Sequence, residues 1–191
     1  PITDDGYDVL LNVCSLWREG THFGWGAVSA FPDVEPALGY YDEGIPEVAD
    51  WEIKFMVENG IDVQHFCWYC PSNNQLEPIK RSGLNFALHD GFFNAEYSDM
   101  MKFTFMWENS GVNTTNLEDF KTYIWSYWMD YYFLDDRFYT IDNKLVFTTW
   151  SYGNFKKAFG DTNEGAQEAV KFMNDDAKAH GFDGIMLFFA D

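Results

Sequence analysis

The sequence has 191 residues, of which 47% are hydrophobic and 20% aromatic, so one domain can bury a sizeable core. Its 31 acidic and 12 basic side chains give a formal net charge of −19, which disfavours nucleic acid and anionic membrane surfaces as partners. The charge fits a soluble protein that handles neutral or cationic small molecules and glycans, although acidity also serves solubility alone.

Short apolar runs alternate along the chain with stretches of helical periodicity. The apolar runs predict strands at residues 7–16, 61–69, 102–107, 144–150 and 183–190. The periodic stretches predict helices at residues 47–59, 74–86, 116–133 and 164–180. No apolar run reaches the ~20 residues that a bilayer crossing needs, so no membrane insertion is expected.

Two predicted helices carry signals at their ends. Pro46 opens the first and Gly60 follows its end. Its predicted buried face consists of Val48, Trp51, Phe55 and Met56. Asn116 is a favourable N-cap for the third helix, with Asp119 at the position of the capping-box acid. A turn is predicted at Asp90-Gly91.

The order of elements predicts the fold class. Short apolar strands separated by helices are typical of parallel strands buried on both faces, hence an α/β protein. The junctions at 58–62 and 180–185 repeat one form, with a Gly after the helix and an Asp near the next strand. We therefore predict a (β/α)8 barrel of the TIM type with about five β/α units present. Residues 1–191 would be the N-terminal part of one catalytic domain, truncated at its C-terminus. The alternative is a doubly wound open sheet, but no Gly-rich phosphate loop follows any strand.

Aromatic side chains recur at the ends of the predicted strands. In a parallel barrel the active site forms at the C-terminal ends of the strands, and four of the five ends carry a Trp. The end residues are Trp17, Trp68, Tyr69, Trp107, Glu108, Asn109, Trp150 and Asp191. A sugar ring stacks its C–H face on an aromatic plane, so the pattern predicts a glycan substrate. Core packing is the alternative explanation.

Glu108 is the predicted catalytic carboxylate, and Asp191 is the candidate second acid. Alternation along the strand puts Thr104, Met106 and Glu108 on one face, which is the more polar one and is expected to face the barrel mouth. The opposite face consists of Phe103, Phe105 and Trp107. Glycoside hydrolysis normally takes two carboxyl groups. Asn109 is expected to bind sugar hydroxyls, because its amide both donates and accepts. Glu108 as a hydroxyl ligand and Asp191 as a turn residue are the alternatives.

The long loop at 17–46 adds further candidates. Trp25, Tyr40, Tyr41 and Asp42 are predicted to bind substrate, although turns favour Asp and Gly in any case. His89 is a weaker candidate for the same role.

The cysteines suggest neither a disulfide framework nor a metal site. Cys14, Cys67 and Cys70 are three in number. The Cys67–Cys70 spacing is formally C-x-x-C, but Pro71 follows it where a redox site needs a helix N-terminus. One such pair is also a poor zinc site. We expect no metal and no cofactor.

Several blocks of the sequence carry a family resemblance. They are LGYYDEG at 38–44, PEVADWEIK at 46–54, ENGID at 58–62, CWY at 67–69, ALHDGF at 87–92, MWEN at 106–109 and IDNKLVF at 141–147. Together they resemble the WbsX-like domain, which is related to glycoside hydrolase family 99, the endo-mannosidase group. The resemblance implies a (β/α)8 barrel that acts on glycans in polysaccharide breakdown or assembly. It also implies that the catalytic pair lies late in the barrel, beyond residue 191, with Glu108 as a binding or supporting carboxylate.

The leading hypothesis is a glycoside hydrolase that acts on a poly- or oligosaccharide. The alternatives are a non-catalytic glycan-binding protein on the same scaffold and a glycosyltransferase. A transferase should carry a D-x-D motif or a phosphate loop, and the sequence has neither. Besides the glycan, the expected partner is the missing C-terminal half of the barrel or another copy of the chain. The chain starts at Pro1, so it is expected to be processed or excised. An extracellular or periplasmic location is expected from the substrate class only.

Overall fold

The structure of the protein, a computed structural model, describes residues 6–18, 24–70, 84–111 and 116–191. The strands are β1 (Leu10–Val13), β2 (Val63–Tyr69), β3 (Lys102–Glu108), β4 (Thr140–Ile141), β5 (Lys144–Thr149) and β6 (Gly184–Phe189). The α-helices are α1 (Pro46–Glu58), α2 (Leu117–Asp119), α3 (Ser126–Trp128), α4 (Tyr152–Ala158) and α5 (Asn163–Ala179). The π-helical segments are Ala87–Gly91, Phe120–Trp125 and Met129–Phe133, and the 3₁₀ helices are Trp25–Ala27, Pro32–Val34, Phe92–Asn94 and Ser98–Met100.

All five predicted strands are present, and β4 and α4 are additional. Three of the predicted helices are present. Two of them are α1 and α5, and the third, predicted at 116–133, consists of α2, Phe120–Trp125, α3 and Met129–Phe133 in chain order. Most of the predicted helix at 74–86 lies outside the described residues. None of the helices in the described ranges is long and apolar enough to span a membrane.

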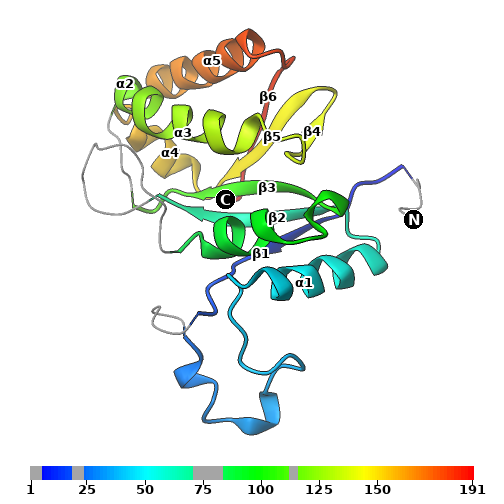
Figure 1. Ribbon diagram of the computed structural model, residues 1–191. Coiled ribbons are helices and arrows are strands. Elements are labelled where there is room, and N and C mark those ends of the chain that lie inside the picture. Colours follow the sequence, from blue (N-terminus) through cyan, green and yellow to red (C-terminus); the bar gives the residue numbers. More distant parts are fainter. Residues whose placement is uncertain (1–5, 19–23, 71–83, 112–115) are drawn as a thin grey trace. The chain divides into compact units, whose positions relative to one another are not determined.

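The chain divides into two compact units. Residues 1–66 and 81–102 form unit 1, and residues 67–80 and 103–191 form unit 2. Both units contain parallel strands joined through helices (Figure 1). This confirms the predicted α/β class with alternating strands and helices.

Unit 1 is built around β1, α1 and the first part of β2. β1 pairs in parallel with β2, from Leu10 beside Val63 to Val13 beside Phe66. β1 was expected to be buried, but Leu10 and Leu11 are each 39% exposed. The predicted apolar face of α1 is confirmed at Met56 but not at Trp51 and Phe55. Its buried residues are Ala49, Ile53 and Met56, and Trp51 and Phe55 lie half exposed.

Glycine geometry shapes two features of the chain. Gly60 and Gly181 both have a positive φ, of 73° and 95°, which confirms the repeated helix-to-strand junction. The turn predicted at Asp90-Gly91 is wrong, because both residues lie in the π-helical segment Ala87–Gly91. There a Cβ on Gly91 would lie 2.4 Å from the carbonyl oxygen of Glu43, so the close approach of two backbones explains this glycine.

The sheet of unit 2 has β5 at its centre. β5 pairs in parallel with β3 and with β6, and antiparallel with β4. The β4–β5 hairpin turns at Asp142 and Asn143, which both have a positive φ, as a two-residue hairpin turn requires. The helices of unit 2 pack on one face of these strands (Figure 1).

Aromatic side chains fill the space between this sheet and its helices. Phe105 lies 4.9 Å from Trp128 and 5.4 Å from Tyr132 between ring centroids, and Trp107 lies 5.5 Å from Trp128. Phe103, Phe105 and Trp107 therefore share the helix-covered face of β3, which confirms the predicted alternation along that strand. Thr104, on the opposite face, donates its hydroxyl to the Val146 carbonyl oxygen.

Candidate functional site

Glu108 and Trp150 stand side by side at the carboxyl ends of β3 and β5. The register pairs Met106 with Thr148 and Trp107 with Thr149, and the next position puts Glu108 beside Trp150. The Trp150 N–H continues this ladder by donating to the Trp107 carbonyl oxygen at 2.9 Å. Because side chains alternate along each strand, both residues belong to the face away from the helices.

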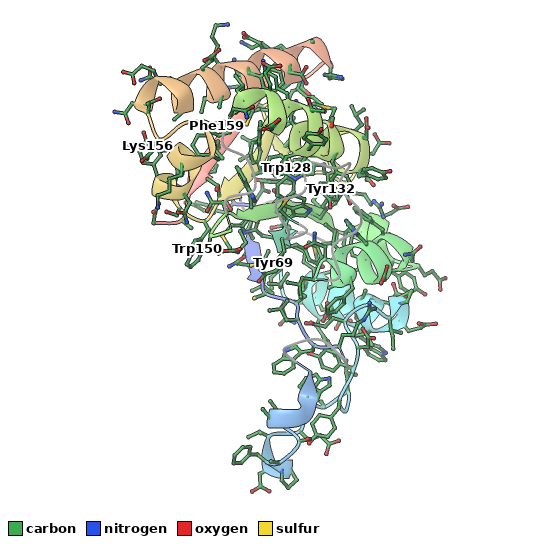
Figure 2. All side chains as sticks on the ribbon, turned by 90° about the vertical axis from the view of Figure 1, so that its left-hand side faces the viewer. Tyr69, Trp128, Tyr132, Trp150, Lys156 and Phe159 are labelled. Carbon is green, nitrogen blue, oxygen red and sulfur yellow. The ribbon has the colours of Figure 1, made fainter. Side chains whose placement is uncertain are left out.

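Both side chains are accessible. Trp150 is 50% exposed, and Glu108 is half-buried with Oε1 accepting from the Ser110 N–H at 3.2 Å. Tyr69, the last residue of β2, is also half-buried and alternates with the helix-facing Trp68. Figure 2 looks onto the carboxyl ends of the strands, where Tyr69 and Trp150 are labelled. The structure thus brings together a carboxylate and aromatic rings on one face of unit 2.

Phe188 was not predicted as a site residue but belongs to the same face. It pairs with Thr148 in the β5–β6 register and is 51% exposed. Its neighbour Phe189 contacts Phe155 of α4 at 5.4 Å, so alternation turns Phe188 away from the helices. The same alternation, applied to the sequence, would have found it.

Asn109 has a different place from the one predicted. Its side chain is fully buried; Nδ2 donates to the Ser151 carbonyl oxygen at 2.9 Å, and Oδ1 accepts from the Ser151 N–H at 3.1 Å. A side chain that is buried and occupied in this way positions the neighbouring strand end and presents no group to a sugar hydroxyl.

Trp68 and Trp107 are core residues in the structure. Each is only 1% exposed. Trp68 donates its indole N–H to the Tyr132 hydroxyl at 2.8 Å, and Trp107 packs against Trp128 and Phe120. The core-packing alternative therefore accounts for these two strand ends, because both rings lie on the helix-covered face. In this arrangement neither ring can stack on a sugar.

Asp191 caps the beginning of α4. Its Oδ1 accepts from the Tyr152 N–H at 3.0 Å. This bond, together with a hydrogen bond from Ser151, lowers the pKa of the Asp191 carboxyl. A lowered pKa favours the ionised carboxylate, and in that form Asp191 cannot act as the acid that protonates a leaving group.

In unit 1, Arg18 joins two carboxylates from distant parts of the chain. Its Nε lies 2.9 Å from Asp42 Oδ1, and its Nη1 lies 3.0 Å from Asp90 Oδ2. The guanidinium also lies 4.2 Å above the ring of Phe86. Asp42, predicted to bind substrate, is thus engaged in an ion pair and also accepts from the Gly44 N–H. The loop at 17–46 contains one Arg and no Lys, so the sequence alone could have singled out Arg18.

The aromatic residues of that loop pack on one another. Trp17 and Trp25 stack with ring centroids 4.1 Å apart and planes at 11°. Trp25 is buried, donates Nε1 to the Tyr41 carbonyl oxygen at 2.6 Å, and lies 5.5 Å from Tyr40. Trp25 is therefore the centre of this loop, whereas Tyr40, at 39% exposure, keeps an accessible edge. His89 is buried and stacks on Phe93 at 6.0 Å, so it too is a core residue.

Glu43 and Glu52 line one cavity of about 480 Å³ in unit 1, together with Tyr41. Glu43 Oε2 accepts from the Trp17 N–H at 2.7 Å. Burial raises the pKa of Glu43 to about 8, and the negative charge of Glu52 adds to this rise. Burial raises the pKa of Glu52 to about 7. Glu43 belongs to the turn at 39–44 that the sequence singled out, but the raised pKa values of both residues depend on burial in the folded loop.

Possible metal ligands do not cluster in the described ranges. No group of three or more His, Cys, Asp or Glu side chains there is arranged to hold a metal ion. Cys14, Cys67 and Cys70 form no disulfide among the described residues, and burial raises the pKa of Cys70 to about 12. A thiol with such a pKa is unreactive at neutral pH.

No family model and no curated protein matches the sequence. Among solved structures, the chain is similar to a GH99 endo-alpha-mannosidase from Bacteroides thetaiotaomicron in complex with bis-tris-propane, with a TM-score of 0.54 and 15% sequence identity. The similarity covers 94% of this chain and 57% of that chain. A second GH99 endo-alpha-mannosidase structure from that organism has a TM-score of 0.44 and 19% identity, over 68% of this chain and 36% of that chain. The first similarity confirms the fold that the family resemblance implied.

Proposed function

We propose that this chain is part of a glycoside hydrolase that acts on a poly- or oligosaccharide. The observation that carries the proposal is the pair of Glu108 and Trp150, adjacent on the open face at the carboxyl ends of β3 and β5. Carboxyl ends of parallel strands are where α/β barrels place their active sites. The fold shared with a GH99 endo-alpha-mannosidase supports the same substrate class.

The chemistry of the pair suits a sugar. Trp150 offers a half-exposed indole on which the C–H face of a pyranose ring can stack. The carboxylate of Glu108 lies beside it, where it can accept hydrogen bonds from ring hydroxyls or exchange a proton at the glycosidic oxygen. Hydrolysis needs a second carboxyl group, and Asp191 and further residues of the full-length protein are the candidates.

Sugar release by the full-length protein tests the proposal. Neutral oligosaccharides, α-mannans among them, are incubated with the protein, and the products are separated by anion-exchange chromatography. We expect release of shorter sugars, and we expect Trp150→Ala to raise KM. Glu108→Gln tests the role of the carboxylate: it lowers kcat if Glu108 takes part in the chemistry, and raises KM alone if Glu108 only binds hydroxyls. Glu168→Gln, on the exposed side of α5, is the matched control and should change neither constant.

A non-catalytic glycan-binding protein is the second candidate. It is favoured because, along the described strands of unit 2, Glu108 is the one carboxylate on the face that carries Trp150. Under this alternative, calorimetry detects oligosaccharide binding that depends on Trp150, and no sugar is released. Sugar transfer from a nucleotide sugar, without hydrolysis, would instead favour the glycosyltransferase. Absence of both binding and turnover across neutral glycans would contradict the carbohydrate proposal itself.

A further inference from the structure

The exposed side of α1 carries an apolar groove of about 530 Å³. Trp51 of α1 lines it together with Tyr97 and Met100 from the segment before β3. These three side chains are 48%, 51% and 57% exposed, respectively. A contiguous exposed apolar surface on a soluble protein marks an interaction site, and Trp, Tyr and Met are residue types enriched in protein interfaces.

The groove is held in shape by hydrogen bonds within unit 1. The Tyr97 N–H donates to Asp50 Oδ1 at 2.9 Å, which ties the segment before β3 to α1. The Met100 N–H donates to the Tyr97 carbonyl oxygen at 3.0 Å, which closes the 3₁₀ helix Ser98–Met100. A preformed groove loses little conformational entropy when a partner binds.

The rim of the groove is acidic. Glu47, Asp50 and Glu58 line it with a single basic residue, Lys54. Lys54 Nζ lies 2.6 Å from Glu58, so this ammonium is already paired. The negative charges of Glu47 and Asp50 are therefore not balanced by a basic residue of the lining. The electrostatic complement of this rim is a cationic partner.

Two other occupants fit less well. A second copy of the chain would bring the same acidic rim and a net charge of −19, and like charges oppose each other at an interface. A glycan needs hydrogen-bonding groups beside the aromatic ring. Here one oxygen of Asp50 already accepts from the Tyr97 N–H and Lys54 is bound to Glu58, and most of the lining is apolar, with Ile53 and Val57 beside Trp51.

We infer that this groove binds a short amphipathic segment of a partner protein, with its apolar side chains on Trp51, Tyr97 and Met100 and its Lys or Arg side chains facing Glu47 and Asp50. The groove follows α1 from Glu47 to Glu58, a length of about 17 Å. That length accommodates roughly three turns of helix, the arrangement in which an amphipathic helix lies in an apolar groove. None of these residues belongs to the proposed glycan site, so the inference stands independently of it.

Binding of designed peptides to the full-length protein tests the inference. The probe is a fluorescein-labelled 14-residue peptide of Leu and Lys with an amphipathic helical pattern, followed by anisotropy at physiological salt. The controls are a scrambled peptide of the same composition, which keeps the charge without the apolar face, and a Leu/Glu peptide of the same pattern. We expect only the first peptide to bind well.

Variants separate the groove from general attraction to an acidic protein. Trp51→Ala should weaken binding by about tenfold or more, as a central aromatic anchor does, and Met100→Ala should weaken it less. Glu47→Gln should weaken binding and reduce its salt dependence, whereas the matched Glu168→Gln on α5 should leave both unchanged. Equal binding of the scrambled peptide, equal effects of the two Glu variants, or full affinity in Trp51→Ala would each overturn the inference.

Hydroxyl-radical footprinting supplies a readout that needs no variant. Trp51, Tyr97 and Met100 should be oxidised in the free full-length protein and protected when the Leu/Lys peptide is bound. If they are already protected in the free protein, its own residues or a second copy cover the groove, and the inference is wrong. If an oligosaccharide protects these residues and the peptide does not, the groove binds a glycan and the inference of a protein partner is wrong.

Discussion

Asn109 and Ser151 are joined by two reciprocal hydrogen bonds between one side chain and one backbone. Asn109 Nδ2 donates to the Ser151 carbonyl oxygen, and the Ser151 N–H donates to Asn109 Oδ1. Glu108 and Trp150 immediately precede these two residues in the sequence. The relative position of the proposed sugar contacts therefore depends on a buried side chain that no ligand reaches.

Replacing Asn109 should disturb both stability and the proposed site. Asn109→Ala leaves the half-buried Ser151 N–H and carbonyl without their partner, at a cost of about 2 kcal/mol in the free energy of unfolding. Urea unfolding of the full-length protein measures the change, and Glu168→Ala is the exposed control. If the variant unfolds like the wild type and keeps its oligosaccharide affinity, Asn109 does not position Trp150.

The carboxyl groups of Glu43, which is buried, and Glu52, which is half-buried, should make stability depend on pH. Their pKa values in the folded chain are about 8 and about 7, against an ordinary value of 4.5. Between pH 4.5 and these raised values, the unfolded chain releases protons that the folded chain keeps. The contribution of these two groups to the free energy of unfolding should therefore be highest below pH 4.5. It should fall as pH rises and level off above about pH 8.

Glu52→Gln and Glu43→Gln test this dependence, because each replaces the carboxyl group by an uncharged side chain of nearly the same size. An uncharged amide keeps an acceptor oxygen for the Trp17 N–H or a partner for Gln64. Each variant should gain stability relative to the wild type at pH 8 and gain little at pH 4. Urea titrations at pH 4, 6 and 8 measure the difference. A stability gain that is the same at all three values would show that ionisation is not its cause.

The parts of the structure that follow from local pattern could be predicted from the sequence. Alternation along β3 identified the two faces of that strand, and Asn116 does accept from the Asp119 N–H at 2.9 Å as an N-cap. The same alternation, applied to every strand end, would have assigned Trp107 to the core with Phe103 and Phe105. Trp107 and Trp150 both stand at strand ends, but Trp107 is 1% and Trp150 50% exposed, so the face of the strand decides which ring is accessible.

Long-range contacts could not be predicted in this way. Arg18 and Asp90 are 72 residues apart, and Asn109 and Ser151 are 42 apart. Nothing in the local sequence specifies such pairs, because they depend on how separate elements come together. The buried face of α1 is a similar case. Ala49, Ile53 and Met56 are its buried residues, whereas the larger aromatic side chains of Trp51 and Phe55 are half exposed.

The indole N–H groups of unit 2 should distinguish its buried tryptophans. Trp68 donates to Tyr132, whereas Trp107 Nε1 is buried with no hydrogen-bond partner among the described residues. Trp68→Phe loses ring volume and a hydrogen bond; Trp107→Phe loses volume but also removes an unsatisfied donor. Trp68→Phe should therefore cost more, by about 1–3 kcal/mol, in parallel urea titrations. Equal costs would indicate that Trp107 has a partner in the full-length protein.

Two glycine positions should respond differently to the same added methyl group. At Gly60 the φ of 73° is unfavourable for Ala, but nothing lies within 4 Å of the added Cβ, so Gly60→Ala should cost about 1 kcal/mol. At Gly91 φ is −79°, which other residues also adopt, but the Cβ would lie 2.4 Å from the Glu43 carbonyl oxygen. Because backbone must move to relieve that contact, Gly91→Ala should cost about 3 kcal/mol or more. It should also displace Glu43 from Trp17 and thereby weaken the pH dependence of stability.

Thermal unfolding of both glycine variants at pH 5 and pH 8 measures the loss of stability and its pH dependence together. A Gly91→Ala protein as stable as Gly60→Ala, with an unchanged pH dependence, would show that the π-helical segment does not press on Glu43 in this way.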